Sequence, residues 1–97
     1  MGRKAENQRF SNIAATTGAF DLSGGAYGVC VSATFGGGSV TLQRLAADAT
    51  TFVTCLTAFS AAGYATVNLP NGTYRFAIAT ASAVYIDIVA IVEVDYP

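Results

Sequence analysis

Short segments in which apolar and polar residues alternate are the sequence feature that most limits how this chain can fold. Between residues 26 and 35, Tyr27, Val29 and Val31 share one parity, and the smaller Cys30 and Ser32 share the other. Successive side chains of a β-strand point to opposite faces of the sheet, so this period of two predicts a strand with one face in the core. No segment shows the apolar spacing of an amphipathic helix. We therefore expect an all-β protein.

The alternation recurs in segments that are separated by turn residues, of which Pro70-Asn71-Gly72 is the strongest signal. We expect about seven strands, over residues 20–22, 26–35, 39–45, 51–59, 64–70, 73–81 and 83–94. Strands at this spacing, with short connections, predict an antiparallel β-sandwich, here a jelly-roll-like one. The other residues expected to point inward on the clearer strands are Val40, Leu42, Ala65, Val67, Leu69, Tyr74, Phe76, Ile78, Val84, Ile86, Ile88 and Val92.

Residues 1–19 differ from the rest of the chain, because they are polar and show no sustained period. We expect an extended N-terminal arm over residues 1–19, followed by the sandwich domain over residues 20–97. The arm holds three basic residues, Arg3, Lys4 and Arg9, and two large apolar ones, Phe10 and Ile13. We expect these five to bind a partner, with the cations on an acidic surface and the apolar pair in apolar pockets.

Charge is scarce in this chain: 11% of its residues are Asp, Glu, Lys or Arg, against about 25% in ordinary soluble domains. A small domain has much surface for its volume, and freely soluble domains usually cover that surface with charge. This composition indicates that other proteins cover part of the surface; a Thr-rich surface that needs no neighbour is the alternative. On the last strand, Tyr85, Val89 and Ile91 share the outward parity and form the expected interface face.

The sequence offers few groups for chemistry. It contains no histidine and no Gly-x-Ser-x-Gly segment, so we expect no enzyme, no catalytic residue, no cofactor and no metal site. Cys30 and Cys55 are interpreted as small buried residues with free thiols, and a disulfide is the alternative. Arg75 and Asp87 share the outward parity on successive strands and are expected to pair.

Two classes of partner are not expected. Five Lys and Arg residues, three of them near the N-terminus, are too few for a nucleic-acid footprint. Residues 76–94 are apolar, but Asp87 interrupts them and β-branched residues alternate along them, which favours a pair of strands over a membrane-spanning helix.

Three motifs in residues 23–92 carry a resemblance to a known group of proteins. They are Gly24-Gly25-x-Tyr27, Gly37-Gly38-Ser39-Val40-Thr41-Leu42-Gln43 and Gly63-Tyr64-x-Thr66-Val67-x-Leu69-Pro70-x-Gly72-x-Tyr74-Arg75. The stretch resembles small β-sandwich proteins encoded among the virion genes of tailed bacteriophages and prophages. Some of these are capsid decoration, or cement, proteins, which sit on the outside of the head and clamp neighbouring capsomers.

The resemblance implies a cement protein that stabilises contacts between major capsid proteins on the capsid exterior, after synthesis in the cytoplasm of a host bacterium. Its implied partners are the major capsid protein and further copies of itself, with a trimer among the options because cement proteins often occupy threefold positions. Two alternatives stay open. One is another virion component, such as a tail or head-fibre protein. The other is a glycan- or host-surface-binding module in which Tyr27, Tyr64, Tyr74 and Tyr85 stack on sugars.

Overall fold

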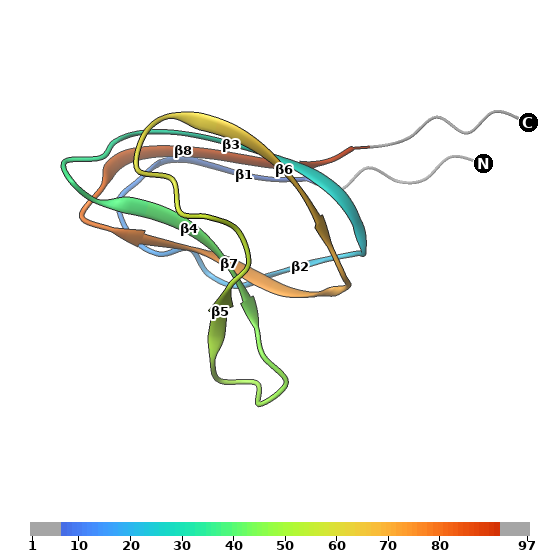
Figure 1. Cartoon of the computed structure of the whole chain (residues 1–97). Coiled ribbons are helices and arrows are strands. Elements are labelled where there is room, and N and C mark those ends of the chain that lie inside the picture. Colours follow the sequence, from blue (N-terminus) through green and yellow to red (C-terminus); the bar gives the residue numbers. More distant parts are fainter. Residues whose placement is uncertain (1–6, 92–97) are drawn as a thin grey trace, which may run out of the picture.

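The computed structural model describes residues 7–91, and within that range it contains eight β-strands and no helix (Figure 1). They form two four-stranded sheets, ordered β1-β8-β3-β6 (the first sheet) and β2-β7-β4-β5 (the second sheet). The expected antiparallel β-sandwich is confirmed, with eight strands in place of about seven. The strands are β1 (Asn7–Ile13), β2 (Phe20–Leu22), β3 (Gly25–Thr34), β4 (Ser39–Leu45), β5 (Phe52–Thr54), β6 (Gly63–Leu69), β7 (Gly72–Ala79) and β8 (Ser82–Ala90).

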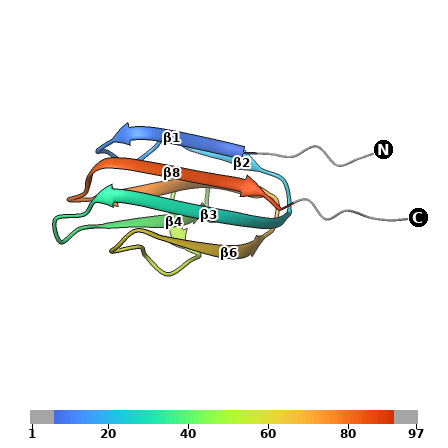
Figure 2. The same ribbon diagram turned by 90° about the horizontal axis from the view of Figure 1, so that it is seen from above.

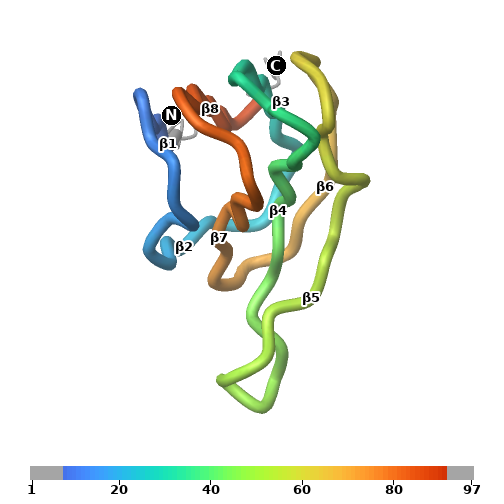
Figure 3. Tube along the Cα trace, turned by 90° about the vertical axis from the view of Figure 1, so that its left-hand side faces the viewer, coloured from blue at the N-terminus to red at the C-terminus, as the bar shows by residue number. Residues whose placement is uncertain are grey.

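The strand order is that of a jelly roll. β1 pairs with β8, β2 with β7, β3 with β6 and β4 with β5, all antiparallel, so the first half of the chain runs beside the second half like one long hairpin. The additional pairs β3·β8 and β4·β7 roll this hairpin into two sheets. Figure 2 looks down on the first sheet, and Figure 3 shows the two layers from the side.

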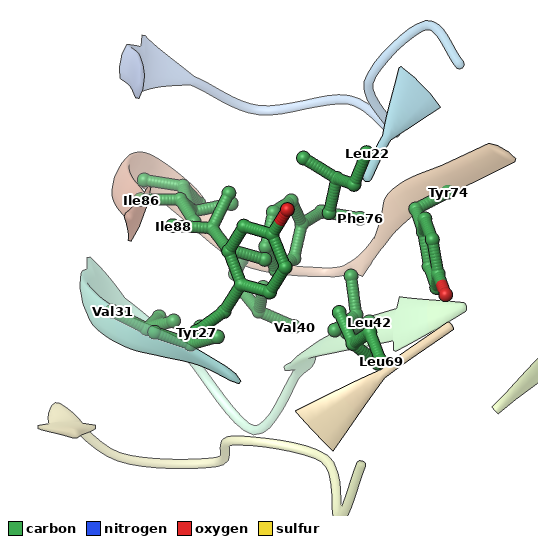
Figure 4. Packing of buried hydrophobic residues seen from close by; sticks show 13 residues of the cluster. Leu22, Tyr27, Val31, Val40, Leu42, Leu69, Tyr74, Phe76, Ile86 and Ile88 are labelled. Atoms are coloured by element: carbon green, nitrogen blue, oxygen red, sulfur yellow. The ribbon is translucent and has the colours of Figure 1, made fainter. Parts of the chain in front are cut away.

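Alternate residues from both sheets meet in an apolar core between the layers (Figure 4). On β8, for example, Val84, Ile86 and Ile88 are at most 1% exposed, as their shared parity predicts. Ile78 also has the inward parity but is only half-buried, and Val92 lies outside the described residues. The buried core residues are Leu22, Tyr27, Val29, Val31, Val40, Leu42, Leu69, Tyr74, Phe76, Ala81, Val84, Ile86 and Ile88.

Two buried tyrosines each form a hydrogen bond to the turn that precedes their own strand. The Tyr27 hydroxyl donates to the carbonyl oxygen of Ser23 at 2.5 Å, and the Tyr74 hydroxyl donates to the carbonyl oxygen of Pro70 at 2.6 Å. Each acceptor lies four residues before its tyrosine, in the turn that precedes the strand. A buried hydroxyl without a partner would be costly, so these bonds satisfy the phenol and tie the turn to the core.

The prediction that residues 1–19 form an extended arm is wrong for residues 7–13, which are strand β1 of the first sheet. The pairing with β8 shifts register between Phe10 and Ile13, where a β-bulge inserts an extra residue and Asn12 adopts a φ of 53°. The bulge lets Phe10 and Ile13 both pack against the core although they are three residues apart. The sequence therefore lacks the period of two that would have identified a strand.

Residues 14–19 carry the chain from the first sheet to the second. The Thr17 amide donates to the carbonyl oxygen of Phe76, and the Phe76 amide donates to Thr17 Oγ1, both at 3.0 Å. The Ile78 amide donates to Thr16 Oγ1 at 3.1 Å. Thr16 and Thr17 therefore form hydrogen bonds with backbone groups at the edge of β7. Because residues 7–13 are a strand of the first sheet, the structure has no domain boundary between residues 19 and 20.

The β4–β5 hairpin extends away from the two layers (Figures 1 and 3). The segment expected as one strand over residues 51–59 is a strand only at Phe52–Thr54. Beyond it, the Cys55 amide donates to the carbonyl oxygen of Leu42, and Phe59 and Val40 exchange two backbone hydrogen bonds. This segment follows β4 irregularly, which explains why its apolar residues do not keep one parity.

Candidate interaction surface

The outer face of the first sheet is the surface that points away from the core, and it is the surface seen in Figure 2. Strand register places one residue from each strand in a row across it: Arg9 of β1, Asp87 of β8, Cys30 of β3 and Tyr64 of β6. Residues two positions along each strand belong to the same face, because side chains alternate.

The charge on this face is balanced. Arg9 Nε lies 3.4 Å from Asp87 Oδ1, with the Arg9 side chain 70% exposed and that of Asp87 40% exposed. An ion pair this open contributes little to stability, because water and salt screen it. Within residues 7–91 these two are the charged residues of the face, so its net charge is zero.

Tyr64 lies over the backbone of Gly28. A Cβ atom placed on Gly28 would be 2.5 Å from the Tyr64 hydroxyl oxygen and 3.1 Å from two ring carbons. Only glycine leaves this space free, so Gly28 lets the ring lie across the neighbouring strand instead of standing in solvent. Tyr64 is nevertheless 64% exposed, and its outer surface is open to contact.

Two shallow hollows lie side by side on the outer face. The first, about 190 Å³, is bounded by Tyr64 and Gly28 on one side and by Val89 and Ile91 on the other. The second, about 200 Å³, lies over β8 between β1 and β3, and it is bounded by Arg9, Tyr85 and Ser32, among others. Cys30 and Asp87 line both hollows and separate them.

Three of the four large apolar residues that are exposed in residues 7–91 belong to this face. They are Tyr64 (64% exposed), Tyr85 (49%) and Ile91 (38%); the fourth, Val53 (52%), lies on the projecting hairpin. Of the predicted interface residues, Tyr85 and Ile91 are exposed and Val89 is half-buried beside them. Tyr64 also belongs to this surface, which was not predicted. Its parity is opposite to that of the inward-facing Ala65 and Val67, and this pattern could have placed it on the outer face.

The four tyrosines that would stack on sugars in a glycan-binding module divide into a buried pair and an exposed pair. Tyr27 and Tyr74 are core residues, 2% and 0% exposed. Tyr64 and Tyr85 are exposed, but they lie on β6 and β8, which are separated by β3, and each lines a different hollow. The face therefore offers two separate aromatic contacts and not one continuous stacking platform.

The N-terminal segment holds the five residues that were predicted to bind a partner. Arg3 and Lys4 lie outside the described residues. Arg9 is exposed on the outer face, as described above. Phe10 and Ile13 face the core of their own chain: the Phe10 ring centroid is 5.8 Å from that of Phe20 and 6.1 Å from that of Phe76. These two side chains therefore pack against the core of their own chain, and their binding to a partner stays a prediction.

Arg75 and Asp87 do not pair, because β7 and β8 belong to different sheets. Arg75 Nε donates to Gln43 Oε1 at 2.8 Å, and its guanidinium lies 4.0 Å from the centre of the Phe52 ring. A guanidinium over an aromatic face is attracted by the ring quadrupole. These contacts cross β7, β4 and β5, and they stiffen the outer side of the second sheet where the hairpin begins.

Both cysteines are free thiols: Cys30 is in β3 of the first sheet, and Cys55 follows β5 and lies beside β4 of the second. Cys30 is exposed at the centre of the outer face, which corrects the expectation that it is buried. Cys55 is half-buried next to β4, with its sulfur 3.5 Å from the carbonyl oxygen of Leu42. Burial raises the pKa of the Cys55 thiol because the uncharged form is favoured away from water.

The tip of the projecting hairpin is organised by Asp48. Its Oδ1 accepts the amides of Thr50 and Thr51, both at 2.9 Å, and its Oδ2 accepts the Thr51 hydroxyl at 2.7 Å. Hydrogen bonds to a carboxylate favour its charged form, and those from Thr50 and Thr51 lower the pKa of Asp48 to about 2. The carboxylate has a structural role here as the anchor of the loop.

Residues 7–91 contain no group of three or more His, Cys, Asp or Glu side chains placed to hold a metal ion. The same residues include no helix that is long and apolar enough to span a membrane.

Comparison of the chain with protein-family models, with curated proteins and with solved structures finds no match.

Proposed function

We propose that this chain is a structural protein of a bacteriophage particle, namely a capsid decoration protein that binds the outside of the head through the outer face of its first sheet. The observation that carries the proposal is the chemistry of that face. It presents Tyr64, Tyr85 and Ile91 to solvent, and within the described residues its charges amount to one balanced, exposed ion pair.

This surface has the composition of a protein interface. The cores of such interfaces are enriched in aromatic residues and depleted in charge, and grouped exposed apolar residues on a small soluble domain commonly mark a binding site. The three residues are not needed for the chain's own core, which closes between the two sheets without them. Their exposure is therefore better explained by a partner than by folding.

The fold supports the proposal less directly. Jelly rolls occur in viral capsid and lectin domains, among others, and a fold by itself does not define a function. The rigid two-layer body suits a protein that bridges neighbours, because it presents its contact face with little loss of entropy on binding. A lattice of capsid proteins would bind many copies and add stability through many modest contacts.

The test is binding to purified particles from which this chain is absent. Wild-type protein is expected to sediment with the particles, and Tyr85→Ser is expected to weaken binding by at least about tenfold, as removal of a buried aromatic contact does. Val53→Ser is the matched control, since Val53 is 52% exposed and Tyr85 is 49% exposed, but Val53 lies off the face. Equal binding of all three proteins, or no binding of wild type, would overturn the proposal.

Two further readouts separate the alternatives. A copy number on the scale of the whole capsid lattice supports decoration of the head, whereas a few copies per particle point to a tail or head-fibre component. Binding of the isolated protein to a glycan array, lost in both Tyr64→Ser and Tyr85→Ser, would favour a sugar-binding module instead.

A further inference from the structure

The four outer strands of the sandwich are not equally protected against pairing with another chain. The first sheet ends in β1 and β6, and the second ends in β2 and β5. An edge strand presents unpaired backbone N–H and C=O groups, and proteins usually limit this with short strands, bulges or charged residues.

Three of the edges carry such protection. β1 is interrupted by the bulge between Phe10 and Ile13, and it bears the cation of Arg9. β2 and β5 are each three residues long, and β2 also contains Asp21. A strand of three residues offers too few hydrogen bonds to hold a partner strand.

The fourth edge, β6, has none of these features. Its seven residues, Gly63–Leu69, pair with β3 in an uninterrupted register from Gly25↔Leu69 to Val31↔Gly63. The strand contains no charged residue and no proline. In the part of the chain that the structure describes, β3 is its one strand partner, and no turn or loop hydrogen bond involves its backbone. β6 is therefore a regular, neutral edge strand that has β3 as its strand partner on one side and none on the other within residues 7–91.

We propose that β6 pairs antiparallel with β6 of a second copy of this chain, joining two first sheets into one continuous sheet across a twofold axis. Full overlap of Gly63–Leu69 with its copy places Thr66 opposite Thr66 of the second copy, and Tyr64 opposite Asn68 of the second copy. Thr66, Tyr64 and Asn68 are all exposed. Opposed threonines are a favourable cross-strand pair.

The absence of charged residues on β6 favours a second copy of this chain as its strand partner. A twofold interface brings each side chain near its own counterpart, so a central charge would meet an identical charge. β6 avoids this penalty, whereas β1, with Arg9 near its middle, does not. The inference does not rest on the proposed capsid role, because pairing at this edge uses the backbone groups of Gly63–Leu69, whatever the outer face of the sheet binds.

A pair of charged variants tests the proposal. Sedimentation of the full chain over a wide concentration range is expected to show a reversible monomer–dimer equilibrium. Thr66→Lys and Thr66→Glu are each expected to weaken it by at least about tenfold, since like charges then oppose each other at the axis. Mixing the two variants is expected to restore dimers, because opposite charges then meet.

Ser32→Lys is the matched control, because Ser32 is exposed on β3 in the middle of the outer face and away from the edge. It is expected to dimerise like wild type, and unchanged urea midpoints would show that all three variants are folded. The proposal is overturned if the wild type stays monomeric, if both Thr66 variants dimerise normally, or if mixing them restores nothing. Dimers that Ser32→Lys abolishes would place the contact on the face instead.

Discussion

Replacement of Phe10 by alanine tests whether β1 belongs to the folded body. Phe10 is half-buried and its ring packs near those of Phe20 and Phe76, at centroid distances of 5.8 and 6.1 Å. A fully buried Phe→Ala change costs about 3–5 kcal/mol, so half burial corresponds to about 2 kcal/mol. The cost of a Phe→Ala change already includes the aromatic contacts that it removes, so the expected total stays at about 2 kcal/mol.

The assay is equilibrium unfolding in urea. With a slope of about 1–3 kcal/mol per molar urea for a small domain, this loss lowers the unfolding midpoint by about 1 M. Arg9→Ala is the control on the same strand, because its side chain is exposed, and it is expected to change stability by less than about 0.5 kcal/mol. If Phe10→Ala unfolded at the wild-type midpoint, residues 7–13 would be a detached arm and the assignment of β1 would be wrong.

Four further outcomes are expected. Tyr74→Phe removes the hydrogen bond to the Pro70 carbonyl and should lower the free energy of unfolding by about 1 kcal/mol, while Tyr64→Phe on the surface should leave it unchanged. Gly38→Ala should destabilise the fold by at least about 2 kcal/mol, since the added Cβ would overlap the Ala79 carbonyl oxygen; Gly18→Ala, with nothing within 4 Å of its Cβ, is the neutral control. The folded-state pKa of Asp48 is lowered from 3.8 to about 2, so its bonds to Thr50 and Thr51 are fully present above pH 3.8 and are lost as the pH falls through 2; an NMR titration of the two amides with a midpoint near 3.8 would contradict this. Alkylation of the native protein should modify Cys30 well before Cys55, which is half-buried and whose pKa is raised by burial; mass spectrometry of the digested protein would show the order.

Most of the fold could be predicted from sequence because the clear strands follow the simple alternation. In β3 and β8, Val29, Val31, Ile86 and Ile88 have the inward parity and are buried. The failure at β1 has a specific cause: the bulge between Phe10 and Ile13 breaks the period of two, so the sequence of this strand was interpreted as part of an extended arm. One consequence is that a deletion of residues 1–13 would remove an edge strand together with any partner contact, and would not isolate a binding role.

The candidate surface was only partly predictable. Parity on one strand identified Tyr85 and Ile91, but it could not show that Tyr64 shares their face, because that depends on β3 lying between β6 and β8. Parity also cannot show which strands are neighbours in a sheet, and for this reason the predicted pair of Arg75 and Asp87 was wrong. Neighbouring strands along a chain usually pair, yet a jelly roll sends β7 and β8 to opposite sheets.

The most direct test of the central claim uses Cys30 as a reporter, since this exposed thiol lies at the centre of the outer face and lines both hollows. Its alkylation rate is measured in the free protein and in the assembled particle. If the outer face is the surface that binds the capsid, Cys30 should react readily in the free protein and be protected in the particle. Equal rates in both states would show that the face remains open, and would contradict the account.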